Sequence, residues 1–84
     1  KTRDFIESLR TENIMISQVV FKKDGLFEFQ TEEDWYILLS ERSDYKLSLD
    51  NLKIALREQI KEKRSELEYI DLRLENKVFY KFKD

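Results

Sequence analysis

The spacing of apolar residues predicts a helix followed by three strands in the first half of the chain. Over residues 2–12 the apolar side chains recur at helical spacing, and Thr2 precedes them as a candidate helix cap. The next three segments are rich in β-branched and aromatic residues and are predicted to be strands: residues 14–22, 26–31 and 35–40. The third of these is apolar on both faces, which is typical of a strand in the middle of a sheet.

Two short polar segments join these strands. Asp24-Gly25 lies between the first two strands, and glycine adopts a positive φ without steric cost, so we expect a tight hairpin there. The acidic run Glu32-Glu33-Asp34 forms the second turn. The first half of the chain therefore predicts a three-stranded antiparallel meander.

The second half of the chain begins with a long helix. A polar loop at residues 41–47 ends at Ser48, which has the properties of an N-cap, and Asp50 supplies negative charge to the first turn. The helical pattern extends from about Leu49 to Leu67, with Ile54 pointing away from the apolar stripe. Its last turns are rich in charged residues and are expected to be solvated.

Two alternating segments close the chain at residues 68–74 and 77–83, with a turn at Glu75-Asn76 between them. The predicted element order is α-β-β-β-α-β-β. This order indicates an α+β fold, in which a single, largely antiparallel sheet of about five strands has two helices packed on one face.

The amino-acid composition excludes most enzyme classes. The 84 residues contain no cysteine, no histidine, no proline and one glycine, which excludes thiol and histidine catalysis, zinc fingers, disulfides and glycine-rich phosphate loops. None of the 18 acidic residues lies beside a feature that would bury it and raise its pKa. We therefore expect a protein without enzyme activity, cofactor or metal. The net charge of −2 argues against a nucleic-acid binder.

Length indicates one domain over residues 1–84. The first residue is Lys1 rather than methionine, so we expect the chain to be a fragment of a longer protein. The longest apolar run, residues 35–39, is far shorter than the roughly 20 residues of a membrane-spanning helix.

The last predicted strand carries the strongest indication of function. Its alternation places Val78, Tyr80 and Phe82 toward the core and Phe79 outward between two lysines. A terminal strand leaves its outer edge open unless it inserts into the sheet, and an open edge can pair with a partner strand. The lysines of this strand either protect the edge from aggregation or steer an acidic partner, and both alternatives stay open.

The segment from Tyr69 to Lys81, YIDLRLENKVFYK, resembles the end of the extracytoplasmic β-domain of the bacterial cell-division family FtsQ/DivIB. That family shows a helix, a Tyr-Ile/Val-Asp-Leu/Met-Arg sequence, a short turn and a final aromatic strand. Upstream, the short helix, the Asp-Gly turn and the leucine-spaced long helix agree with the family pattern, so the similarity covers nearly the whole chain. The residue after Arg73 departs from the pattern, because Leu74 stands where the family often has an aromatic residue.

The resemblance implies a non-catalytic divisome scaffold domain. It lacks the cytoplasmic tail, membrane span and POTRA domain of the family and belongs on the extracytoplasmic side of the cell membrane. The implied partners are the membrane-proximal coiled-coil proteins FtsB and FtsL, with FtsB adding a strand to the last strand of the domain. The partner-binding residues that the resemblance implies are Arg73, Leu74, Glu75, Asn76, Val78, Phe79, Tyr80 and Phe82.

Three other uses of the same chain remain open at this point. Aromatic residues between lysines on a sheet can stack single-stranded nucleic acid, which defines a different class of function. The chain could equally be an isolated or engineered stable fragment whose binding edge is unused. A free edge and an exposed aromatic residue could also support a weak strand-paired homodimer.

Overall fold

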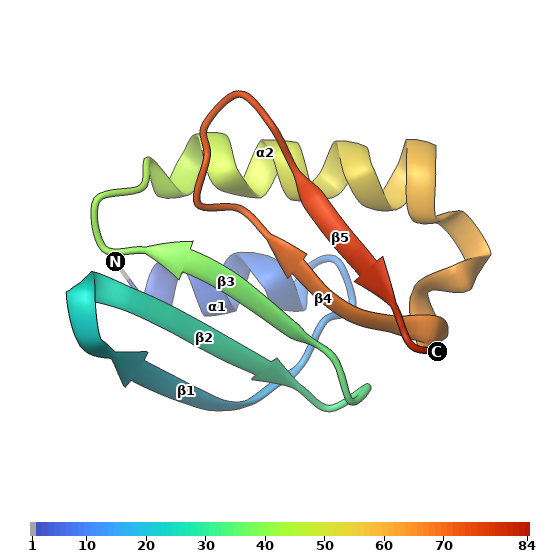
Figure 1. Cartoon of the computed structure of the whole chain (residues 1–84), viewed down its shortest axis with the longest axis horizontal. Helices are drawn as coiled ribbons and strands as arrows, with labels where there is room; N and C mark the ends of the chain where they lie inside the picture. The colour runs from blue at the N-terminus through green and yellow to red at the C-terminus, as the bar shows by residue number, and fades with distance from the viewer. Residues whose placement is uncertain (1) are drawn as a thin grey trace.

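The computed structural model describes residues 2–84 and has the predicted α+β fold (Figure 1). The main elements are α1 (Thr2–Arg10), β1 (Ile16–Lys22), β2 (Leu26–Thr31), β3 (Tyr36–Ser40), α2 (Tyr45–Ala55), β4 (Leu67–Asp71) and β5 (Phe79–Phe82). Two helical segments, η2 (Leu56–Ile60, a π turn) and η3 (Lys61–Glu66, a 3₁₀ segment), follow α2 directly, and a 3₁₀ turn, η1 (Lys23–Gly25), joins β1 to β2.

The five strands form one sheet in the order β1-β2-β3-β4-β5, with β3 in the middle as predicted. Three neighbouring pairs are antiparallel, whereas β3 and β4 are parallel, with Tyr36 opposite Tyr69 and Ile37 opposite Ile70. The sheet is therefore mixed. Parallel neighbours need a crossover, and α2 with its continuation makes this connection.

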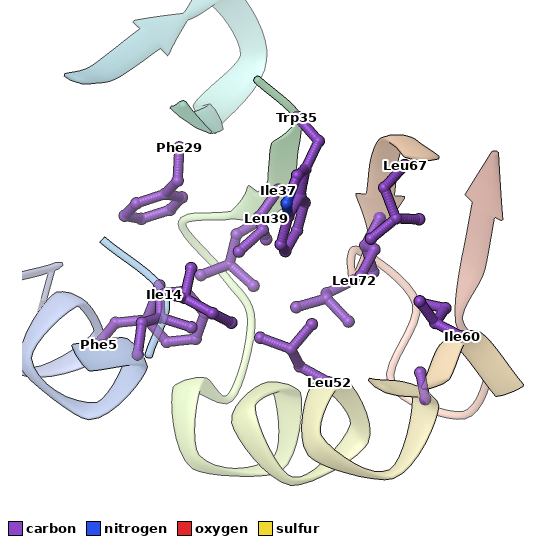
Figure 2. Packing of buried hydrophobic residues seen from close by; sticks show 13 residues of the cluster. Phe5, Ile14, Phe29, Trp35, Ile37, Leu39, Leu52, Ile60, Leu67 and Leu72 are labelled. Atoms are coloured by element: carbon purple, nitrogen blue, oxygen red, sulfur yellow. The ribbon is translucent and has the colours of Figure 1, made fainter. Parts of the chain in front are cut away.

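The core lies between one face of the sheet and the two helices, as predicted. Aromatic and aliphatic side chains of β2, β3 and β4 meet those of α1 and α2 (Figure 2). The buried set is Phe5, Leu9, Ile14, Phe29, Trp35, Ile37, Leu39, Leu52, Ala55, Ile60, Leu67, Ile70 and Leu72. The other face of the sheet has no helix over it within residues 2–84, so side chains on that face contact solvent.

The start of α2 differs from the prediction. Asp44, not Ser48, is the N-cap, and its carboxylate accepts hydrogen bonds from the backbone N–H groups of Lys46 and Leu47 at 3.1 Å each. Ser48 is buried inside the first turns of the helix. Aspartate caps as well as serine does, so both residues suit the role and core packing selects the earlier start.

The end of this helical region also differs, because the α-helix stops at Ala55 rather than near Leu67. The chain passes through the π turn and reverses at Lys61, whose φ is 54°. Leu67 is then the first residue of β4 and is fully buried.

The hairpin between β1 and β2 forms at the predicted turn. Asp24 and Gly25 have φ values of 63° and 71°, and Lys22 pairs with Leu26 across the turn. The Gly25 carbonyl accepts a hydrogen bond from the N–H of Glu41 at 2.8 Å, which holds the turn against the end of β3.

Arg64 fastens two separate loops to η3, a role that the sequence pattern did not indicate. Its guanidinium donates to the Glu33 carboxylate, with Nε at 2.8 Å, and to the backbone carbonyls of Glu12 and Asn13. Glu33 also accepts a hydrogen bond from the indole N–H of Trp35 at 3.0 Å. The pKa of Glu33 is below its ordinary value, mainly because its carboxylate accepts the side-chain hydrogen bond from Arg64. Partial burial acts in the opposite direction and raises this pKa.

Candidate functional site: the β5 edge

β5 is an edge strand of the sheet. It pairs with β4 on one side, with Asp71 opposite Phe79 and Ile70 opposite Tyr80, and no segment of residues 2–84 pairs with its other side (Figure 1). An edge strand presents unpaired N–H and C=O groups along its outer side. The sequence left the position of this strand open, and in the fold it is an edge.

Successive side chains of β5 lie on opposite faces of the sheet. Phe79 lies on the face away from the helices, is 47% exposed and matches its predicted outward position. Tyr80 lies on the helix face opposite buried Ile70, but it is 36% exposed, so the prediction that it belongs to the core is wrong. An edge strand has a neighbour on one side only, and the outer half of Tyr80 is left uncovered.

The other two predicted core residues of this region are partly buried. Val78 and Phe82 pack against the core cluster without being enclosed by it. The Phe82 ring centroid lies 5.6 Å from that of Tyr80 and 5.8 Å from the Lys63 ammonium. The helix face of β5 is thus an apolar strip that ends at the open edge.

A groove runs between α2 and the start of β5, with a volume of about 410 Å³. Its walls come from α2 and η2 on one side and from the β4–β5 connection on the other, which Figure 1 shows rising beside α2. Ile54 is 52% exposed in this groove, and the Asn51 side-chain amide donates to the Glu75 carbonyl at 2.9 Å. The lining residues are Asn51, Ile54, Ala55, Gln59, Glu75, Asn76, Lys77 and Val78.

The connection between β4 and β5 contains the remaining predicted contact residues. A turn forms at Glu75 and Asn76 as predicted, but both predicted strands are too long, because pairing ends at Asp71 opposite Phe79. Leu74 is 51% exposed and lines a second hollow with Phe79. An aromatic side chain, Phe79, and an aliphatic one, Leu74, are therefore both exposed at the β5 edge.

Arg73 is engaged within the chain. Its guanidinium contacts both carboxylate oxygens of Asp71, Nε to Oδ1 at 3.0 Å and a terminal nitrogen to Oδ2 at 2.7 Å, and its N–H donates to the same carboxylate. Partial burial alone would raise the pKa of Asp71, but these hydrogen bonds and the charge of Arg73 together lower it. The same bonds raise the pKa of Arg73. Arg73 therefore braces the end of β4, and a partner carboxylate would have to compete with Asp71.

The lysines near the edge have different surroundings. Lys81 lies 3.7 Å from Glu68 and Lys83 lies 3.1 Å from Asp34, nitrogen to oxygen. Lys77 makes no salt bridge within residues 2–84, and its ammonium lies 5.8 Å from the Phe79 ring centroid. Lys77 is thus a cation at the beginning of the edge that no carboxylate of the described chain neutralises.

The sequence pattern did not indicate the groove or one aromatic pair. Tyr36 and Tyr69 lie side by side on the open face of the sheet, with ring centroids 5.7 Å apart, because β3 and β4 are parallel neighbours. The position of Ile54 off the helical stripe was the one available sign of the groove, since an apolar residue there covers no core.

Within residues 2–84 no group of three acidic, histidine or cysteine side chains is placed to hold a metal ion. The described helices include none with the length and apolar character needed to cross a membrane. What the edge can offer is backbone hydrogen bonding, apolar contact and positive charge.

No protein-family model matches the chain, and a search of curated proteins finds no match either. The resemblance to the FtsQ/DivIB β-domain therefore rests on the motif between Tyr69 and Lys81 and on the order of the elements. The family assignment remains a prediction.

Proposed function

We propose that this domain is a non-catalytic binding module that captures an extended segment of a protein partner by strand addition to β5. The observation that carries the proposal is the position of β5 at the sheet edge with a groove beside it. Added strands bind through backbone hydrogen bonds and gain specificity from pockets for alternate side chains. Phe79 on one face and Ile54 on the other are the contacts best placed for specificity.

The resemblance to the FtsQ/DivIB β-domain supports a particular setting for this activity. In that setting the domain is the extracytoplasmic part of a divisome scaffold protein anchored in the cell membrane. Its partner is a coiled-coil protein of the FtsB or FtsL kind, whose extended segment pairs with β5. We propose this as the biological context.

Binding of single-stranded nucleic acid is the weaker alternative. The open face does carry aromatic rings, but its cations lie beside acids: Lys22 is 2.9 Å from Glu28, and Lys81 is close to Glu68. A phosphate backbone needs a positive surface to release its counterions. A gel shift with single-stranded oligonucleotides at about 100 mM salt should therefore show no complex, and a salt-sensitive complex would favour this alternative.

The test of strand addition uses a peptide spanning the extended segment of an FtsB-family protein. Phe79→Asp should leave thermal unfolding nearly unchanged, because the ring is half exposed, and should weaken capture by about thirtyfold, as loss of an interface anchor worth about 2 kcal/mol does. The matched control is Phe21→Asp, which changes an exposed phenylalanine on the opposite edge strand β1 and should leave capture intact.

Proline substitutions test the backbone part of the mechanism. Successive residues of an antiparallel strand direct their N–H groups to opposite sides, so one of Phe79 and Tyr80 offers its N–H outward. Of Phe79→Pro and Tyr80→Pro, the variant that keeps the melting temperature should lose capture. Undiminished capture by that folded variant would exclude strand addition at β5.

A further inference from the structure

The strands at the two edges of the sheet, β1 and β5, have lysines in or beside them and contain no acidic residue. β1 has Lys22 at its end with Lys23 following, and the segment from Asn76 to Lys83 contains three lysines. Neither β1 nor this last segment contains an acidic residue, although the chain as a whole has 18 acidic and 16 basic residues. Lys22, Lys81 and Lys83 lie beside Glu28, Glu68 and Asp34, so Lys23 and Lys77 are the edge lysines without a salt bridge among the described residues.

This distribution disfavours a second copy of the chain as the occupant. Pairing β5 with a second β5 brings Lys77, Lys81 and Lys83 of both chains to the same seam. Like charges facing each other across paired strands are destabilising. Lysines on edge strands are also a known means of preventing edge-to-edge association.

The faces of β5 define a pattern for a different occupant. Phe79 and Lys81 lie on the face away from the helices. Lys77, just before β5, has its ammonium 5.8 Å from the Phe79 ring centroid and no carboxylate partner within residues 2–84. The half-exposed Tyr80 lies on the helix face, and Val78, just before β5, lines the groove together with Ile54. Side chains of an added strand alternate between the same two faces.

We infer that the segment captured by β5 is an extended strand of another protein, with acidic residues on the face away from the helices and apolar residues on the face toward α2. The inference rests on the proposed strand addition and specifies its partner. Carboxylates of the added strand lie near Lys77 and Lys81, while its apolar side chains cover Tyr80 and enter the groove beside Ile54. The same lysines attract the acidic partner and repel the lysines of a second copy of the chain.

The experiment uses two defined probes on a small monomeric carrier protein. One carries a ten-residue tail of alternating glutamate and valine, and in the matched probe lysine replaces each glutamate. The glutamate tail should bind the wild-type domain at least tenfold more tightly at low salt, and the difference should shrink to about twofold at 0.5 M salt, because exposed charges are then screened. Equal affinity for both tails, or no binding of either, would overturn the inference.

A charge-reversal pair locates the effect on β5. Lys77→Glu should weaken the glutamate tail about fivefold and strengthen the lysine tail, because Lys77 is exposed and its loss breaks no salt bridge of the described chain. Lys23→Glu makes the same change beside β1 and should alter neither affinity. An equal effect of the two substitutions would mean that net charge alone governs binding, which overturns the inference.

Two further results separate this inference from strand addition itself. If both tails bind equally and the outward proline abolishes binding, the charge pattern is wrong while strand addition stands. If the glutamate tail binds and the outward proline has no effect, strand addition fails. The exclusion of a second copy is tested by sedimentation at low salt, where the wild-type domain should be monomeric at about 100 μM, and a dimer would contradict it.

Discussion

Two single residues, Gly25 and Arg64, hold loops of this domain in place by different means. Gly25 has a φ of 71°, and a Cβ added there would lie 2.7 Å from a carboxylate oxygen of Glu41. Arg64, in contrast, acts through what it contacts, because one guanidinium satisfies a carboxylate and two backbone carbonyls. Both residues fasten loops, one by lacking a side chain and the other by the number of its donors.

Gly25→Ala should destabilise the domain by about 1–3 kcal/mol, since the left-handed conformation costs an L-residue roughly 1–2 kcal/mol and the contact with Glu41 adds to it. Urea unfolding measures the change. The double variant Gly25→Ala/Glu41→Ala should recover the steric part and leave the conformational part. Full recovery in the double variant would show that backbone strain contributes nothing.

Arg64→Gln should lower stability at neutral pH by about 1–2 kcal/mol. The control is Arg57→Gln, which changes an exposed arginine that makes no salt bridge within residues 2–84. The pKa of Glu33 is lowered in the folded state, so its ionised form contributes stability above the ordinary value of 4.5. That contribution disappears as the pH falls below 4.5. The difference between wild type and variant should therefore shrink in acid, and a difference independent of pH would contradict the role of Glu33.

At the scale of elements, β2 has its predicted bounds and the other strands differ by one to three residues at an end, whereas the helix ends and one strand pairing depart further. Alternation and turn residues are local signals, so strands and the Asp24-Gly25 hairpin can be predicted from them. Ser48 and Asp44 are equivalent as caps, and the earlier start is accompanied by packing of Tyr45 against the core cluster. The parallel pairing of β3 with β4 depends on the path of the crossover, which no local pattern encodes.

At the candidate site, too, the properties set by local sequence could be predicted, and those set by distant segments could not. The outward position of Phe79 follows from alternation within one strand, and the position of the strand at an edge was left open by the sequence. The exposure of Tyr80 depends on what lies beyond the strand, and the contacts of Arg64 join segments far apart in the chain. Properties that depend on distant segments are those that the sequence pattern did not indicate.

Asp44→Ala should destabilise the domain by about 1 kcal/mol, the usual cost of a lost N-cap, and should reduce the helical signal in circular dichroism. Asp50→Ala removes an exposed aspartate from the middle of the same helix and is the matched control. A larger effect at Asp50 than at Asp44 would place the start of the helix later, as the sequence pattern had indicated.

The whole molecule has one core shared by both helices and by strands β2, β3 and β4. Its radius of gyration is 11.6 Å, close to the roughly 12 Å expected for a compact chain of this length. With one core of this size, no part of the domain can lose its packing without exposing the rest. Small single-core domains unfold in one cooperative step.

Trp35, the single tryptophan, is 1% exposed and reports directly on that core. Its fluorescence and the far-ultraviolet circular dichroism, which reports on the helices, should therefore give the same midpoint and slope in urea. Two separated transitions would show that the helices and the sheet unfold independently.

The parallel pairing of β3 with β4 also sets the order in which the domain can assemble. β1, β2 and β3 are linked by short turns and can find one another by local search, whereas Tyr36 meets Tyr69 only after the intervening chain has closed a long loop. Closure of such a loop costs entropy before any contact repays it, which slows folding. The rate of folding should thus be governed by the crossover through α2, and the β4–β5 pair joins the rest of the sheet only after this slow event.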